Sequence, residues 1–502
     1  MQLLILLFLS WFSSGQLTPV EGLQISQQDR TQNRIALSNV SNPSFTPSSE
    51  QLDIAISSGM SLFEVSSASN VSIFTEENIS LLFNADIPYP TVNALKLNRN
   101  SIIQSVTNDY LRLSNRQQSF IAAVGLFRYP ADFSNGFNEI ASSIADTISG
   151  MIDKPLYYHS FSKEIVSPQE FSFTADLVNA DSETHSPLSL SSAVVYLEPS
   201  ASDKETLATL AELMEATRGF NESIIIIPAE WFFKIHETHP AIIPVLKNYT
   251  NGRILNMPLP ADAPKPAGAN PGIILLFLIF AALIIQYKYQ PVVLQFMGRY
   301  FFNHSFFMAD ILDNRVRSVS PGLAFMGIHS IVNGLFFLTI FQSFFSDAGL
   351  NILSHYFAPE IARDFELPII FISAVVMGLI VHMLSILWLR LLNREINSFS
   401  KSINLYIWPF IFTLLPTSLL LFNHHTGNLY PVAILMAALY LLTWLVSFAS
   451  ASINAARRLE RFRALNIFFT IGVYSLIFAG LCTALVMVPS LFEPIELALM
   501  MP

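Results

Sequence analysis

The sequence predicts a multi-pass α-helical membrane protein, in which six transmembrane helices follow a cleaved signal peptide and an exported α/β domain that has a β-rich region before it. Three observations lead to this fold class. Hydrophobic residues make up 52% of the 502 residues and charged residues only 13%, which is far more apolar than a soluble enzyme. The second half contains six long apolar segments. Basic residues concentrate in alternate loops between these segments.

The N-terminus, residues 1–15, has the features of a signal peptide. An apolar core of about ten residues is followed by small residues, which predicts cleavage after Gly15. No Lys or Arg precedes the apolar core, so an uncleaved anchor is the alternative. In either case the domain that follows is exported.

The exported domain is expected over residues 51–257. Residues 16–50 are rich in Ser, Thr, Asn, Gln and Pro, which predicts an extended or poorly ordered segment. Apolar and polar residues then alternate in four short stretches, and this period of two is typical of consecutive β-strands. The stretches are 52–58, 61–67, 71–77 and 79–85.

Strands and helices alternate from residue 119 onward, which implies a mostly parallel sheet. Apolar runs at 119–127, 191–198 and 222–228 are the strand candidates. Amphipathic segments at 136–153, 202–219 and 230–248 are the helix candidates. The last helix is interrupted by Pro240 and Pro244.

Loops at the carboxyl ends of such strands usually bind ligands. Here they contain no Gly-rich phosphate loop and no nucleophile elbow, so ordinary polar loop residues are the alternative. His236 and His239 are three residues apart on a helix, but no third ligand accompanies them; no metal site and no cofactor are expected. The candidate ligand-binding residues are Arg128, Asp132, Asn135, Glu198 and Glu230.

A Pro/Ala-rich linker, residues 258–271, precedes the transmembrane domain, residues 272–502. Each of the six apolar segments is about long enough to cross a bilayer. The fourth is short and contains Pro416, which predicts a kink or a tilt. The predicted spans are 272–288, 321–345, 367–391, 406–422, 429–450 and 467–489.

The basic residues predict the orientation of these spans. If the N-terminal domain is outside, eleven Lys and Arg fall in or beside the inner loops, whereas the outer loops contain only Arg363. The positive-inside rule therefore places the N-terminal domain and the C-terminus on the extracytoplasmic side of the cell membrane. The inner residues are Lys288, Arg299, Arg315, Arg317, Arg390, Arg394, Lys401, Arg457, Arg458, Arg461 and Arg463.

Two inner segments are expected at the membrane surface. Residues 291–317 interleave large apolar and charged side chains, which predicts an amphipathic elbow at the interface. Arg299, Arg315 and Arg317 in this elbow are candidates for contact with anionic lipid headgroups. Arg457, Arg458, Arg461 and Arg463 are the candidates in the last inner loop. The alternative is that these arginines only set the topology.

The spans contain few polar side chains and no Asp, Glu or Lys in their interiors. His329 and Asn333 share a face of the second span, and His382 and Ser385 lie in the third. The two histidines fall at nearly the same depth of antiparallel helices, so contact is possible. Three interpretations remain open: hydrogen bonds that hold the bundle together, a path for protons or a small molecule, and bis-histidine ligation of a haem or metal.

Composition limits the partners and the cellular origin. The net charge of −10 and the absence of a separate basic domain argue against nucleic acid. The single cysteine, Cys482, lies in the last span, so the exported domain has no disulfide, which favours a bacterial envelope protein. These features predict a non-enzymatic scaffold or accessory protein that binds an envelope protein. The alternative is a transporter component that uses His329, Asn333 and His382.

Overall fold

The structure is a computed structural model, and it describes residues 34–66, 71, 73–74, 79–161, 168–180, 194–200, 202–217, 223–253, 257, 259, 271–313, 315, 318–357, 366–393, 396, 398–456 and 463–501. The chain divides into two compact units, Met1–Pro264 and Lys265–Met501. The predicted signal peptide lies outside the described residues, as does nearly all of the predicted linker. Each unit is described separately.

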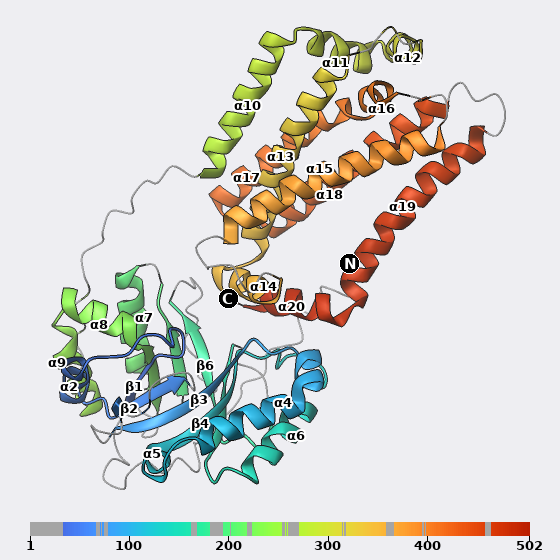
Figure 1. Ribbon diagram of the computed structural model, residues 1–502. Coiled ribbons are helices and arrows are strands. Elements are labelled where there is room, and N and C mark those ends of the chain that lie inside the picture. Colours follow the sequence, from blue (N-terminus) through green and yellow to red (C-terminus); the bar gives the residue numbers. More distant parts are fainter. Residues whose placement is uncertain are drawn as a thin grey trace. The chain divides into compact units, whose positions relative to one another are not determined.

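The first unit is a closed barrel of eight parallel strands (Figure 1). Every neighbouring pair of strands is parallel, and β1 pairs with β8 to close the ring. The prediction of a parallel sheet is confirmed. The strands are β1 (Arg34–Ser38), β2 (Leu62–Ser66), β3 (Ser80–Pro88), β4 (Ile121–Arg128), β5 (Leu156–Ser160), β6 (Phe173–Asn179), β7 (Val194–Glu198) and β8 (Ile224–Pro228).

Helices pack on the outside of the barrel. Parallel strands covered in this way are buried on both faces and read as nearly continuous apolar runs, as in β8, whose five residues are all buried. The apolar core lies between the barrel wall and the helices and includes Leu126, Ile144 and Phe232. The helices are α2 (Ser49–Ser57), α4 (Val92–Leu111), α5 (Asn115–Phe120), α6 (Phe137–Ser149), α7 (Asp203–Thr217), α8 (Ala229–Thr238) and α9 (Ile242–Thr250).

The region before residue 86 differs from the prediction. Residues 52–58 are not a strand, because Ser48 and Gln51 form a capping box that starts helix α2 there. Residues 34–38, expected to be extended or poorly ordered, form the buried strand that closes the barrel. No separate β-rich region exists among the described residues, since β2 and β3 belong to the barrel. Most of 71–77 lies outside the described residues.

The later elements of the barrel agree better with the sequence. Predicted strands at 119–127, 191–198 and 222–228 correspond to β4, β7 and β8, and two of the predicted helices correspond to α6 and α7. The third predicted helix is split into α8 and α9, and the break contains Pro240. Pro lacks the backbone N–H that a continuous helix needs at this position.

The second unit contains six helical segments that are long and apolar enough to cross a membrane, as predicted. A much smaller share of the third span than of the second is buried within the unit, as expected for a helix that faces lipid. The spans are α10 (Pro271–Tyr289), α13 (Ser320–Phe344), α15 (Glu366–Leu392), the composite segment Phe399–Thr426, α18 (Tyr430–Ala455) and α19 (Arg463–Met487).

The fourth span is broken into three pieces, and the break is not where the sequence placed it. Helix α16 (Phe399–Tyr406) is followed by the 3₁₀ helix η3 (Trp408–Thr413) and then by α17 (Leu414–Thr426). Pro416, the predicted kink, lies in the first turn of α17, where a helix tolerates proline. The irregular stretch instead begins beside Pro409.

Helices α13 and α15 pack closely because two glycines face the partner helix. A Cβ at Gly334 would lie 2.5 Å from Val375 and 2.8 Å from Phe371. A Cβ at Gly378 would lie 2.9 Å from the amide nitrogen of Asn333. Small residues allow this close approach between transmembrane helices, and here it brings Asn333 against the backbone of α15.

Four shorter helices complete the described part of the second unit. The predicted amphipathic elbow forms α11 (Val292–Phe302) and α12 (His304–Leu312), whose buried apolar residues include Phe296 and Phe307. Helices α14 (Asp347–Phe357) and α20 (Pro489–Met500) were not predicted. They pack against each other, and Ser346 donates a hydrogen bond to the Met501 carbonyl.

Candidate functional site

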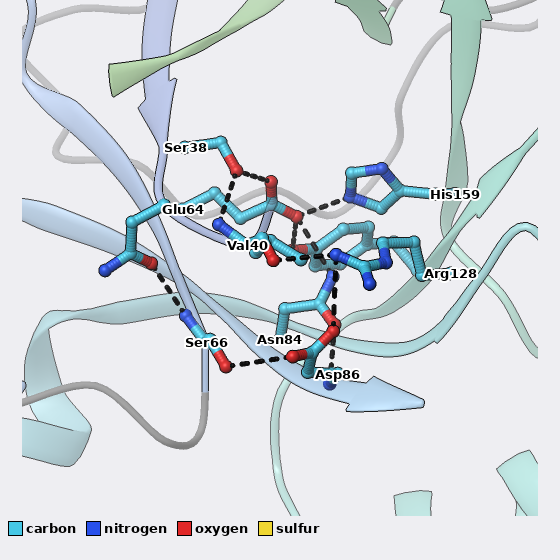
Figure 2. Close-up of polar contacts among 10 residues, drawn as sticks. Ser38, Val40, Glu64, Ser66, Asn84, Asp86, Arg128 and His159 are labelled. Atoms are coloured by element: carbon cyan, nitrogen blue, oxygen red, sulfur yellow. Dashed lines mark hydrogen bonds and ion pairs between the residues drawn. The ribbon is translucent and has the colours of Figure 1, made fainter. Parts of the chain in front are cut away.

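Polar side chains gather at the carboxyl ends of the barrel strands. Because all eight strands run in the same direction, their carboxyl ends meet at one end of the barrel, which is where barrels of this kind bind ligands. Figure 2 shows the polar contacts at this end. The residues that line it include Ser38 of β1, Glu64 of β2, Asn84 of β3, Arg128 of β4 and His159 of β5.

Glu64 is at the centre of the contacts, and its carboxylate is fully buried. Oε2 accepts a hydrogen bond from the Ser38 hydroxyl at 2.6 Å. Oε1 accepts from the Asn84 amide at 3.1 Å and from the Tyr157 hydroxyl at 2.7 Å. His159 Nε2 also lies 2.5 Å from Oε1. Both carboxylate oxygens are therefore occupied by side chains of the protein.

The charge on Glu64 is stabilised despite its burial. Burial by itself raises the pKa of this carboxyl, but the charge of His159 and the hydrogen bonds from His159, Ser38 and Tyr157 outweigh it and lower the pKa from 4.5 to about 2. Glu64 is thus an anion at neutral pH. Each of its oxygens already accepts a hydrogen bond from the protein.

A glycine makes room for these contacts. A Cβ at Gly125 in β4 would lie 2.7 Å from the ring of Tyr157 and 2.9 Å from the amide of Asn84. The ring of Tyr157 therefore occupies space that a side chain at position 125 would need, and from there its hydroxyl contacts Glu64. Its ring also stacks on Phe173, with the centroids 4.9 Å apart.

Arg128, the last residue of β4, contacts the segment after β1 and the end of β3 at the rim of the barrel (Figure 2). Its Nη1 donates to the Val40 carbonyl at 2.7 Å and lies 3.5 Å from Oδ1 of Asp86. The guanidinium carbon lies 5.9 Å from the ring centroid of Tyr89, a cation–π arrangement. These contacts connect the end of β4 with the end of β3 and with the segment that follows β1.

The backbone at this rim is strained. Asp86, Tyr89 and Tyr129 have φ angles of 52°, 51° and 53°, which are uncommon for residues other than glycine. Tyr89 and Tyr129 each precede a proline after a strand, and their rings stack with centroids 6.1 Å apart. Strained backbone of this kind costs about 1–3 kcal/mol per residue and often occurs at functional sites.

The five residues predicted from the sequence do not form one cluster of contacts. Arg128 is at the rim, and Glu198 ends β7. Glu230 lies in the first turn of α8 and accepts a hydrogen bond from Asn42 at 2.9 Å. Asn135 is exposed in the loop before α6. Asp132 is buried and accepts a hydrogen bond from Ser160.

The residues around Glu64 were missed by the sequence reasoning, although a signal was present. Glu64, Asn84 and His159 are strongly polar residues within largely apolar, buried strands. Such residues in a strand buried on both faces require partners inside the sheet. A search for polar residues within the predicted strands would have pointed to Glu64 and Asn84, but not to His159, because its strand β5 was not predicted.

The second candidate site lies in the membrane unit, where His329 and His382 are brought together. Nδ1 of His329 is 2.8 Å from Nε2 of His382. Tyr440 lies 3.5 Å from the other nitrogen of His329, and Tyr406 lies 3.1 Å from that of His382. Asn333 accepts a hydrogen bond from Tyr440 at 3.0 Å. The contacts link α13, α15, α16 and α18.

These hydrogen bonds have one consistent direction. The Asn333 amide donates to the Ala374 carbonyl at 2.7 Å, so its oxygen faces Tyr440 and accepts from it. The Tyr440 oxygen can then accept from Nε2–H of His329, which leaves Nδ1 as the acceptor for Nε2–H of His382. Tyr406 completes the chain as a donor to His382. All members are neutral, and the chain ends at an amide that does not relay protons.

Aromatic rings surround the histidine pair. His382 stacks on Trp444 with ring centroids 4.5 Å apart. The ring of Phe410 in η3 lies 4.5 Å from that of His329 and 4.9 Å from that of His382. The broken part of the fourth span therefore packs directly on the two imidazoles. Ser385 does not contact the imidazoles directly; its hydroxyl donates to the Val381 carbonyl and lies 3.2 Å from the Tyr474 hydroxyl of α19, beside Tyr406.

The basic residues proposed for lipid contact are partly neutralised. Arg299 lies 3.2 Å from one oxygen of Asp310, and Arg315 lies 3.4 Å from the other. Arg315 is also 3.8 Å from Asp313. Both arginines stay largely exposed, and so does Arg463 at the start of α19. Arg317, Arg457, Arg458 and Arg461 lie outside the described residues.

Comparison with protein-family models and with curated proteins finds no match for this chain. Two of the solved structures that overlap with it are crystal structures of GH2 beta-galacturonidase from Eisenbergiella tayi, one bound to galacturonate and one to glycerol. The identities are 12% and 11%, the TM-scores 0.31 and 0.32, and the overlaps cover 40% and 47% of this chain. The chain spans 43% and 52% of those two proteins. Overlaps with such low TM-scores establish neither a common fold nor a shared function.

Proposed function

We propose that this protein is a non-enzymatic integral membrane protein of the cell envelope that couples an exported binding domain to a membrane bundle. The observation that carries the proposal is the state of Glu64. A catalytic acid or base must reach its substrate and exchange a proton with it. Glu64 is buried, and its oxygens accept hydrogen bonds from four side chains. The barrel is better suited to presenting a rigid surface than to carrying out a reaction.

The binding surface of this proposal is the rim at the carboxyl ends of the strands. Arg128 connects the ends of β3 and β4 with the segment after β1 there, and two tyrosines are kept in a strained backbone conformation. The partner is an envelope protein that contacts this rim. The domain faces the extracytoplasmic side of the cell membrane, because the basic residues of the loops predict that orientation. Exposed arginines such as Arg463 contact anionic headgroups on the inner side.

Site-specific photo-crosslinking tests this function in cells. A photoreactive amino acid at Glu230 probes the carboxyl end, and the same amino acid at Ser119, exposed just before β4, probes the opposite end as a matched control. We expect one discrete crosslinked envelope protein from position 230 and none from 119. Arg128→Ala should weaken that crosslink. Equal crosslinking from both positions, or none from either, would contradict the proposal.

A transporter component is the second candidate, and the histidine pair beside a broken span favours it. Broken helices often line substrate paths in transporters. Two features weigh against a transporter. The chain of hydrogen bonds through the histidine pair ends at the amide of Asn333, and aromatic rings pack densely around the two imidazoles. Replacing His329 and His382 by Phe separates the roles: a well-folded protein whose uptake function is lost supports transport, whereas loss of folding supports a structural pair.

A further inference from the structure

A buried lysine lies in the second unit, at the start of the fourth span. Lys401 is in the first turn of α16, and the residue is only 5% exposed. Within the described part of the chain, its ammonium group makes no hydrogen bond and no ion pair. Lysine is almost never buried to this extent unless it is paired. The partner that this position requires is an anion.

The described carboxylates at this end of the membrane bundle are paired with arginines. Helix α12 contacts α16, and Asp310 of α12 lies 3.2 Å from Arg299 and 3.4 Å from Arg315. Asp313, the residue after α12, lies 3.8 Å from Arg315. The remaining carboxylates in the described part of this unit lie at the opposite ends of the spans, and they are Asp347, Glu366, Glu493 and Glu496.

The position of Lys401 within α16 adds to the positive charge. The first N–H groups of a helix lack intrahelical partners and carry a partial positive charge. The Ser398 hydroxyl accepts a hydrogen bond from one of them, the N–H of Lys401, at 3.3 Å. Long side chains of a helix point back toward its N-terminus, so the ammonium group lies close to these N–H groups. A lysine and a helix N-terminus that face the same place form a site for an anion.

The position of this site in the membrane indicates which anion it binds. The segment that begins with α16, Phe399–Thr426, has 28 residues, whereas about 20 are enough to cross the hydrocarbon core. Its first turn therefore lies among the lipid headgroups, where phosphate groups are concentrated. Phe412 of the same span is 57% exposed and Phe302 of α11 is 93% exposed. Acyl chains, which a free anion lacks, cover such side chains.

We propose that Lys401 and the N-terminus of α16 bind the phosphate group of one anionic phospholipid. The phosphate oxygens accept hydrogen bonds from the ammonium group and from the helix N–H groups, and the acyl chains lie along the fourth span. The bound phosphate thus neutralises the charge of Lys401. A single lipid in a fixed site differs from the general contacts of exposed arginines such as Arg463 with headgroups. The site does not depend on what the barrel binds.

Native mass spectrometry of the full-length protein in detergent tests this site. The probes are phosphatidylglycerol, a diacylglycerol with the same acyl chains but no phosphate, and inorganic phosphate, which has no acyl chains. We expect one bound phosphatidylglycerol, and neither of the other two at the same concentration. Lys401→Met should weaken the binding of phosphatidylglycerol about tenfold or more, because a hydrogen bond between charged groups is lost.

Lys288→Met is the matched control, because Lys288 is an exposed lysine in the last turn of α10 at the same end of the bundle. It should leave the binding of phosphatidylglycerol unchanged. Equal binding by Lys401→Met and the unaltered protein would overturn the proposal. Binding of inorganic phosphate as tight as that of phosphatidylglycerol would overturn the assignment to a lipid.

The thermal midpoint in detergent without lipid separates a binding role of Lys401 from a structural one. Methionine has a similar length and removes a charge that no described residue pairs, so Lys401→Met should not lower this midpoint. A clearly lower midpoint would show that Lys401 has a partner within the protein, which would contradict the proposal.

Discussion

Glu64 shows how a single ionised residue can be part of a protein core. Removing a carboxylate from water is costly, and the cost is recovered only when every acceptor position is filled and an opposite charge is close. Ser38, Asn84 and Tyr157 fill those positions, and His159 supplies the charge. Gly125 is required for the geometry, since Tyr157 occupies the space beside it. Five strands therefore contribute to the environment of one carboxylate.

Substitution of Glu64 by Gln should strongly destabilise the barrel. The change keeps the shape but replaces one carboxylate oxygen, an acceptor, by an NH₂ group that can only donate, and a buried polar group left without its partner costs about 1–3 kcal/mol. Urea unfolding of the full-length protein, followed by tyrosine fluorescence of the barrel, measures the change. Glu230→Gln is the control, because Glu230 is exposed, and it should change the free energy of unfolding by less than about 1 kcal/mol.

The pH dependence of the same variant gives an independent check. The folded pKa of Glu64, about 2, lies below the ordinary value of 4.5, so its stabilising effect is complete above pH 4.5 and is lost as the pH falls toward 2. The free energy of unfolding of Glu64→Gln should therefore decrease less between pH 4.5 and pH 2 than that of the unaltered protein. If the free energy of unfolding decreases equally with falling pH in the variant and in the unaltered protein, Glu64 is not ionised in the folded state.

At the scale of helices and strands, the periodic helices α6 and α7 were predictable, whereas only some of the short strands were. The helices α6 and α7 each bury one apolar face, and Ser202 accepts a hydrogen bond from the Glu205 N–H at the start of α7; both helices agree with the prediction. The strands β1, β5 and β6 have five to seven residues each and were not recognised. Their burial arises from neighbours far away in the sequence, and a local pattern contains no information about those neighbours. Residues 52–58 alternate apolar and polar side chains as a strand does, and this local pattern alone did not reveal that they form helix α2.

The glycines between α13 and α15 allow a matched test. Gly334→Ala places a Cβ against Val375 and Phe371, whereas nothing lies within 4 Å of a Cβ at Gly327 on the same helix. Forcing an extra carbon into a packed interface typically costs about 1–3 kcal/mol. We expect a lower thermal midpoint in detergent for Gly334→Ala and no decrease for Gly327→Ala. Equal midpoints would show that the two helices are not closely packed at Gly334.

For the whole molecule, the long apolar segments predicted the six spans, and the alternation of strands and helices predicted a parallel sheet. The closure of the sheet into a barrel could not be predicted, because it depends on the pairing of β1 with β8 across the whole domain. The candidate ligand residues were chosen for their position after strands, and that rule found Arg128 but not Glu64. Functional contacts inside a barrel depend on which residues face inward. The strands of Glu64 and Asn84 were predicted, but the strands of their partners Ser38 and His159, β1 and β5, were not.

The orientation in the membrane can be measured with single cysteines after Cys482→Ser. Cysteines at Ser119 and His425 should react with a membrane-impermeant maleimide in sealed right-side-out vesicles, because both positions are exposed and are expected outside. A cysteine at Gly298 in α11, where a Cβ meets no atom within 4 Å, should react only after permeabilisation. Labelling of Gly298→Cys in sealed vesicles would reverse the predicted orientation.

The pairing of β1 with β8 has a consequence for how the chain folds during synthesis. The first described strand of the barrel emerges from the ribosome long before its partner, since domains are made from the N-terminus onward. Until β8 arrives, a partly formed sheet has two open edges that can pair with other chains. Contacts between such distant segments also form slowly. The nascent barrel should therefore require a holding chaperone, and truncation before Ile224 should yield protein that aggregates or is degraded.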